Sequence, residues 1–114
     1  MGRTAISLNP VAGDALRLLG AQVRIARHAR RWSSAELAAR AGVSVPTVLA
    51  LETGKPSVSI GNALNIAVLA GVDLFGITDP VELARARKRG EDRVALLPAK
   101  TYMPREGADG DFDF

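Results

Sequence analysis

Cysteine is absent from this chain of 114 residues, and aromatic residues make up only 4% of it. The absence of cysteine excludes disulfide bonds, thiolate metal sites and cysteine nucleophiles, and it fits a reducing compartment. Since 47% of the residues are nevertheless hydrophobic, the core must be built from Leu, Val, Ile and Ala. A chain of this length has room for one compact core, and these residues favour an all-helical one.

Long apolar runs are lacking as well. Asn9, Pro10 and Asp14 interrupt the N-terminal region, so we expect no signal peptide. No apolar stretch approaches the length of a membrane span. We therefore expect no membrane partner and a location in the cytoplasm, at the bacterial nucleoid if the protein binds DNA.

Residues for catalysis and metal binding are scarce. His28 is the only histidine, and no other ligand-type residues accompany it at metal-ligand spacing. Glycine-rich phosphate loops and serine-nucleophile motifs are also missing. The sequence therefore predicts no catalytic residue, no metal site, no cofactor and no enzymatic activity.

Charge is unevenly distributed along the chain. Residues 14–60 contain seven Lys or Arg and three acids, a local net charge of +4, whereas residues 106–114 contain four acids and no base. A basic body indicates a polyanionic partner, and the acidic end indicates a separate role for the C-terminal tail.

Apolar periodicity predicts five helices in an all-α fold. The first is expected over residues 13–31, and four later helices should begin after the capping residues Ser33, Ser44, Ser59 and Asp79. The last of these should reach about Lys88. The residues expected to pack in the fourth helix are Ala63, Leu64, Ala67 and Val68.

The stretch from Ser34 to Leu51 has the spacing of a helix-turn-helix motif. Leu37 and Ala38 precede Gly42, and Val48 and Leu51 follow it. A small residue at position 38 allows two helices to cross closely, and glycine at position 42 permits the sharp turn. We therefore divide the chain into a flexible arm (1–10), a helix-turn-helix domain (11–90) and an acidic tail expected to be disordered (91–114).

Residues 14–78 resemble the lambda-repressor-like domains of the Xre family. The matching residues are Leu19-Gly20, Arg24, Arg27, Glu36-Leu37-Ala38, Ala41-Gly42-Val43-Ser44, Thr47, Leu51-Glu52, Gly54, Ile66-Ala67 and Gly71-Val72. The resemblance implies a five-helix fold in which the third helix lies in the major groove of duplex DNA and the second crosses the backbone. It also implies that Glu52 pairs with a basic residue of the first helix, for which Arg27 is the candidate.

The same resemblance implies which residues contact DNA. The residues that face base edges are Ser44, Val45, Pro46, Thr47 and Ala50. Of these, only the two hydroxyl side chains can hydrogen-bond a base, so DNA shape should supply much of the specificity. Candidates for phosphate contacts, from their charge or their place at a helix N-terminus, are Arg24, Arg27, Arg31, Ser33, Ser34, Lys55 and Ser59.

Two protein contacts are expected besides DNA. A homodimer would read a near-palindromic operator, with an interface formed by Val72, Leu74, Phe75 and Ile77. The tail carries apolar side chains that could anchor a partner protein, namely Tyr102, Met103, Phe112 and Phe114. Its acidic ending resembles that of HipB-like antitoxins, which implies a HipA-type kinase toxin as partner, while the domain also fits a stand-alone phage or chromosomal regulator.

Some residues keep more than one interpretation. Trp32 is expected to anchor the boundary of the core, and Arg40 could pair with Glu36 or Glu52 or contact a phosphate. The basic residues near the end of the fifth helix could be solvated, bind DNA or form a protein interface; they are Arg85, Arg87, Lys88, Arg89 and Arg93.

Overall fold

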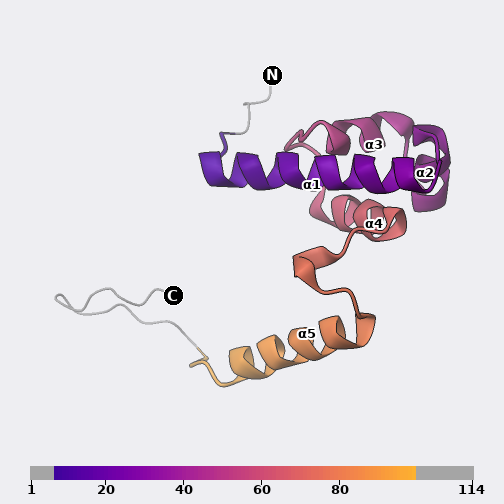
Figure 1. Cartoon of the computed structure of the whole chain (residues 1–114). Coiled ribbons are helices and arrows are strands. Elements are labelled where there is room, and N and C mark those ends of the chain that lie inside the picture. The colour runs from indigo at the N-terminus through magenta and orange to yellow at the C-terminus, as the bar shows by residue number, and fades with distance from the viewer. Residues whose placement is uncertain (1–6, 100–114) are drawn as a thin grey trace. The chain divides into compact units, whose positions relative to one another are not determined.

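The computed structural model describes residues 7–99, and within that range the chain is all-helical, as predicted. Its elements are α1 (Pro10–Ala29), α2 (Ser34–Ala41), α3 (Val45–Glu52), α4 (Ile60–Ala70), the short 3-10 helix η1 (Leu74–Gly76) and α5 (Pro80–Ala95) (Figure 1). The chain forms two compact units. The first contains α1 to α4 and η1 and ends at Thr78, and the second begins at Asp79 and contains α5.

Every α-helix begins with a side chain that accepts a hydrogen bond from a backbone N–H of the first turn. The predicted caps Ser33, Ser44, Ser59 and Asp79 all act in this way. The predicted start of α1 at residue 13 was wrong, because the Asn9 side chain accepts from Val11 N at 2.8 Å and the helix begins at the following proline. Proline is well suited to this first position, where its missing N–H has no partner to lose.

Helix α5 runs further than its sequence predicts. It continues through Gly90 to Ala95 instead of ending near Lys88. Two ion pairs span the glycine, with N–O distances of 2.6 Å for Arg87–Glu91 and 3.4 Å for Lys88–Asp92. Residues 91–95, expected in the tail, are therefore helical, whereas residues 1–6 of the arm and residues 100–114 of the tail lie outside the described residues.

The core of the first unit is aliphatic, as the composition predicts. In Figure 1, α3 and α4 pack on two sides of α1, and α2 packs against both α3 and α4. The buried apolar residues are Val23, Leu37, Ala38, Val48, Leu51, Ala63, Ile66, Ala67 and Ala70. The prediction that Val68 packs inward was wrong, since its side chain is 53% exposed and Ile66 is buried instead.

A glycine sets the distance between α1 and α3. A Cβ atom at Gly20 would overlap the carbonyl oxygens of Leu51 and Glu52 at the end of α3. Because both are backbone atoms, no side-chain rearrangement could accommodate it. The absence of a side chain at Gly20 therefore lets α1 support α3 directly, and α3 is the helix that carries the predicted base-contacting residues.

Candidate nucleic-acid interface

Helices α2 and α3 form the predicted helix-turn-helix. Gly42 ends α2 with φ 70, in the left-handed region where glycine is least strained. The N–H of Val43 donates to the Ala38 carbonyl at 3.0 Å, which closes the turn. Ala38 is buried at the same place. Both residues singled out by the spacing therefore have the predicted structural roles.

One side of helix α3 is buried in the core, and the other side lines a groove open to solvent. Val48 and Leu51 are fully buried, while Pro46, Thr47 and Ala50 line an open groove of about 370 Å³. The predicted base-contacting residue Val45 is half-buried and packs against the core, and Ser44 is exposed at the start of the helix. The structure thus brings three of the five predicted residues into one groove.

The other wall of this groove comes from the connection that leads into α4 and from the first turn of that helix. It is formed by Ser57, Val58, Ser59 and Asn62. Ser59 was a predicted phosphate contact, whereas Ser57 and Asn62 were not predicted as site residues. The helix start at Ser59 was visible in the sequence, but only the folded chain shows that it faces α3.

The two polar candidates for base contacts are bonded to each other. The hydroxyl oxygens of Ser44 and Thr47 are 2.9 Å apart, and Ser44 Oγ also accepts from Thr47 N at 3.3 Å. Since each hydroxyl has one hydrogen, their mutual bond leaves one hydroxyl hydrogen for a ligand. The pair can therefore offer a single donor, together with its remaining acceptor lone pairs.

Arg27 forms a buried ion pair, so its prediction as a phosphate contact is corrected. Its Nε and Nη2 donate to the two Glu52 carboxylate oxygens at 2.7 and 2.9 Å, and its Nη1 donates to the Trp32 carbonyl at 3.0 Å. The two side chains are only 10% and 3% exposed. The hydrogen bonds that Arg27 donates to Glu52 raise the pKa of Arg27 above its usual value. Burial in this pair keeps the guanidinium from DNA.

This ion pair confirms the pairing that the Xre resemblance implies for Glu52. Arg27 lies near the end of α1, and Glu52 is the last residue of α3. A bidentate contact between planar groups fixes both their distance and their relative orientation. The pair therefore holds the C-terminal end of the candidate recognition helix in place.

Trp32 joins the turn after α1 to two arginines. It is half-buried against the core, as predicted, and the guanidinium carbons of Arg30 and Arg40 lie 5.0 and 4.2 Å from its ring centroid. Arg30 Nε also donates to the Ala70 carbonyl at 2.9 Å, and Arg40 forms an exposed ion pair with Glu36 at 3.4 Å. Both arginines therefore have structural contacts.

The remaining candidates for phosphate contacts lie at the surface. Arg24, Arg31, Lys55, Ser33 and Ser59 are exposed, and Ser34 is half-buried in the first turn of α2. Arg31 also has φ 61, a conformation in which glycine is more usual. Their contacts with DNA stay predictions.

Metal-ligand clusters and membrane-crossing helices are lacking from the part of the chain that the structure describes. Among residues 7–99, no group of three or more His, Asp or Glu side chains could hold a metal ion. In the same range, no helix combines the length and the apolar character that a membrane crossing requires.

Comparison with known proteins agrees with this architecture. The family model described as a helix-turn-helix domain matches residues 18–86, which is more than half of the chain and includes all of α2, α3 and α4. No curated protein and no solved structure gives a significant match. The chain belongs to the helix-turn-helix domain family, in agreement with its Xre-like motif, and is thereby a DNA-binding regulator.

Proposed function

We propose that the protein is a sequence-specific transcriptional repressor that lays α3 in the major groove of its operator. The observation that carries this proposal is the division of α3 into a fully buried side and a groove-lining side. The groove side contains Pro46, Thr47 and Ala50, with Ser44 beside them. Gly20 and the Arg27–Glu52 pair hold this helix against the core, so the groove side is presented in one fixed orientation.

Recognition would combine few hydrogen bonds with apolar contacts. Pro46, Ala50 and the exposed edge of Val45 suit thymine methyl groups, while the Ser44–Thr47 pair offers one donor hydrogen. With so few polar readers, sequence-dependent shape of the operator would supply the remaining specificity.

Phosphate contacts would supply most of the affinity. Arg24, Arg31 and Lys55 provide positive charge, and the starts of α2 and α4 provide backbone N–H groups near Ser33, Ser34 and Ser59. Arg31 supports this assignment because an exposed arginine occupies a left-handed position that glycine would adopt with less strain.

The repressor would act as a homodimer on a near-palindrome. The sequence assigned the interface to Val72, Leu74, Phe75 and Ile77, of which Val72 and Leu74 also pack against the core of their own chain. Two recognition helices would then read half-sites about 34–36 Å apart, or a multiple of that spacing.

The regulatory partner would be a HipA-type kinase toxin. In this proposal the protein is the antitoxin, represses its own operon and contacts the kinase with Tyr102, Met103, Phe112 and Phe114 of the acidic tail. The alternative is a stand-alone Xre-type regulator without a toxin. A kinase-like gene beside this one would favour the antitoxin, and its absence would favour the stand-alone regulator. Deleting residues 107–114 then tests the tail contact: the kinase should lose affinity for the truncated protein in calorimetry, while operator binding stays unchanged or rises slightly.

Thr47→Ala tests the placement of α3. An operator is first selected from random duplexes, and affinities are then measured by fluorescence anisotropy. We expect a loss of about 1–3 kcal/mol on the operator and none on random duplex, because a base contact carries sequence information and a backbone contact does not.

Thr53→Ala is the matched control for this variant. Thr53 caps the other end of α3, where its hydroxyl donates to the carbonyls of Leu49 and Ala50, and we expect it to leave specificity unchanged. A loss of equal size on operator and random duplex for Thr47→Ala would contradict the assignment of α3 to the major groove.

A further inference from the structure

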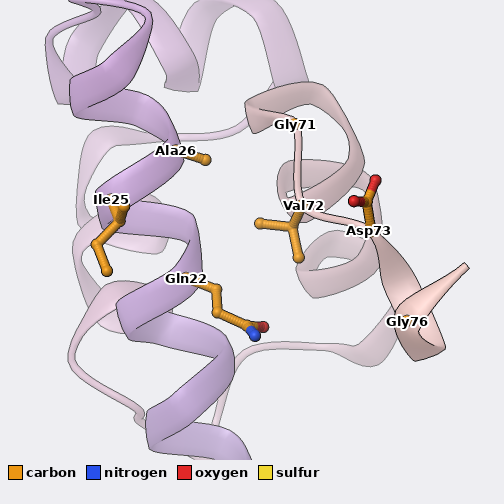
Figure 2. A pocket seen from close by; sticks show the side chains of 7 residues that line it. All are labelled: Gln22, Ile25, Ala26, Gly71, Val72, Asp73 and Gly76. Carbon is orange, nitrogen blue, oxygen red and sulfur yellow. The ribbon is translucent and has the colours of Figure 1, made fainter. Parts of the chain in front are cut away.

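A hollow opens between α1 and the chain that follows α4. Its volume is about 380 Å³, and its lining includes Gln22 and Ala26 from α1 together with Val72. Figure 2 shows Ala26 and Gln22 projecting from α1 toward the side where Val72 projects back. Ile25 forms the outer margin and is 69% exposed. The hollow is thus open to solvent and mostly apolar, with Gln22 and the Asp73 carboxylate as its polar lining, and it lies apart from the groove between α3 and α4.

Phe75 lies directly beside this hollow. It precedes Gly76, which belongs to the lining, yet its side chain is 82% exposed. Its backbone has φ 58, a left-handed conformation that a bulky residue adopts only under strain. Glycine at this position would remove both the strain and the exposed ring. A strained aromatic side chain held in solvent indicates a function for the ring.

We propose that Phe75 of one copy of this chain occupies the hollow of a second copy, and that the second copy reciprocates. The inference rests on the homodimer proposed above. It assigns Phe75 as the side chain that anchors the dimer and the hollow as the site that receives it. A two-fold axis requires a surface that is complementary to itself. An exposed ring at Phe75 and a mostly apolar hollow lined by the next residue, Gly76, meet that requirement, and a single axis between them forms two identical contacts.

The outer side of α1 extends this surface. Val11, Leu18 and Ile25 are exposed and recur every seven residues, so they lie in one row on the side of the helix away from the core. Ile25 ends the row at the margin of the hollow. A stable dimer buries about 800 Å² of each partner, and the row provides apolar area beyond the ring and the hollow.

Sedimentation velocity of the full chain at several concentrations tests whether Phe75 anchors the dimer. Phe75→Gly should raise the dissociation constant of the dimer by about a thousandfold, because the two-fold axis removes two central aromatic anchors at once. Ile60→Lys is the matched control, since Ile60 is similarly exposed, at 78%, but lies at the start of α4 outside the hollow. It should leave the dissociation constant unchanged.

Thermal unfolding separates the loss of the anchor from misfolding. At concentrations where the chain is monomeric, Phe75→Gly should unfold at the same temperature as the wild type or higher, because glycine adopts φ 58 without steric strain. A dimer that survives Phe75→Gly, or a wild type that is monomeric at all concentrations, would overturn the proposal.

Because the chain has no cysteine, engineered disulfide cross-links can test directly whether Phe75 of one copy enters the hollow of the other. A Phe75→Cys chain mixed with a Gln22→Cys chain should form a disulfide-linked dimer under oxidation, since one native Phe75 and one native hollow still meet in the mixed pair. A mixture of Phe75→Cys with Ile60→Cys should not. No cross-link in the first mixture, or an equal amount in both, would show that another occupant fills the hollow.

Failure of this inference and failure of the proposed repressor function give different results. If the wild type binds no duplex DNA, the repressor function is wrong whatever its oligomeric state. If it binds a palindromic operator as a dimer and Phe75→Gly changes neither property, the repressor stands and the anchor is wrong. If both proposals hold, Phe75→Gly should bind a single half-site like the wild type and lose affinity only for the full operator.

Discussion

The first unit and helix α5 are helical for different reasons. In the first unit, α1 to α4 bury nine apolar side chains against one another. Helix α5 has no buried residue and has, instead, a cap at Asp79 and ion pairs between residues three or four apart. Tertiary packing is therefore the main stabilising contribution in the first unit, and local interactions are the main one in α5.

The ion pairs of the two units show the same difference. Arg27–Glu52 in the first unit and Arg85–Glu82 in α5 have almost equal N–O distances, 2.7 and 2.6 Å. The first pair is 10% and 3% exposed, while the second is 64% and 49% exposed. Exposed pairs contribute little because water screens them, whereas breaking a buried pair leaves an uncompensated charge. Exposure, and not distance, therefore distinguishes the two pairs.

Glu52→Gln should produce the largest difference between the units. It leaves the buried Arg27 charge without its carboxylate, so we expect the free energy of unfolding in urea to fall by about 3–5 kcal/mol. The same change in α5, Glu91→Gln, breaks the exposed pair with Arg87 and should cost less than about 0.5 kcal/mol. Equal losses for the two variants would show that burial does not decide the value of these pairs.

Arg24→Ala tests whether the first unit contacts the DNA backbone. Two copies of Arg24, Arg31 and Lys55 would give about six charge contacts per dimer, so operator affinity should fall by roughly 10³ between 50 and 200 mM salt. Arg24→Ala should lower the slope of log affinity against log salt by about two, because it removes one phosphate contact from each copy.

Arg89→Ala is the matched arginine change in α5. Since the proposed phosphate contacts all lie in the first unit, this variant should leave the salt slope unchanged. An equal decrease for both variants would extend the DNA-binding surface into α5 and would favour the DNA-contact interpretation of its basic cluster.

Local signals in the sequence predicted most helix starts but not the end of α5. Ser33, Ser44, Ser59 and Asp79 cap helices as predicted, because a cap depends on a few consecutive residues. The sequence predicted an end near Lys88, just before Gly90, although glycine inside a helix costs only about 1 kcal/mol relative to alanine. The ion pairs across it offset part of that cost.

Contacts between distant residues were less accessible from the sequence. The Arg27–Glu52 pair was suggested by the Xre resemblance and not by the spacing of 25 residues. The meeting of Ser57 and Asn62 with α3 depends on how the chain folds back from α3 into α4. Periodicity places side chains on one helix only, so it could not predict this second wall of the candidate site.

Gly90→Ala should have the smallest effect, and an effect restricted to α5. A Cβ atom at Gly90 meets nothing within 4 Å, so alanine should favour the helix by about 1 kcal/mol through its higher propensity. Hydrogen exchange of the α5 amides should slow by about fivefold, since local opening of α5 becomes less favourable by that amount. The urea midpoint of the first unit should not change, because the nine buried apolar side chains of that unit all come from α1 to α4.

Gly61→Ala makes the same substitution in the first unit. A Cβ atom at Gly61 likewise meets nothing within 4 Å, but α4 unfolds together with the core that it covers. Its gain of up to about 1 kcal/mol should therefore appear in the urea transition of the whole first unit and slow exchange in α1, α3 and α4 together. If Gly90→Ala also raised that transition, α5 would be stabilised by long-range contacts, and the contrast between the two units would not hold.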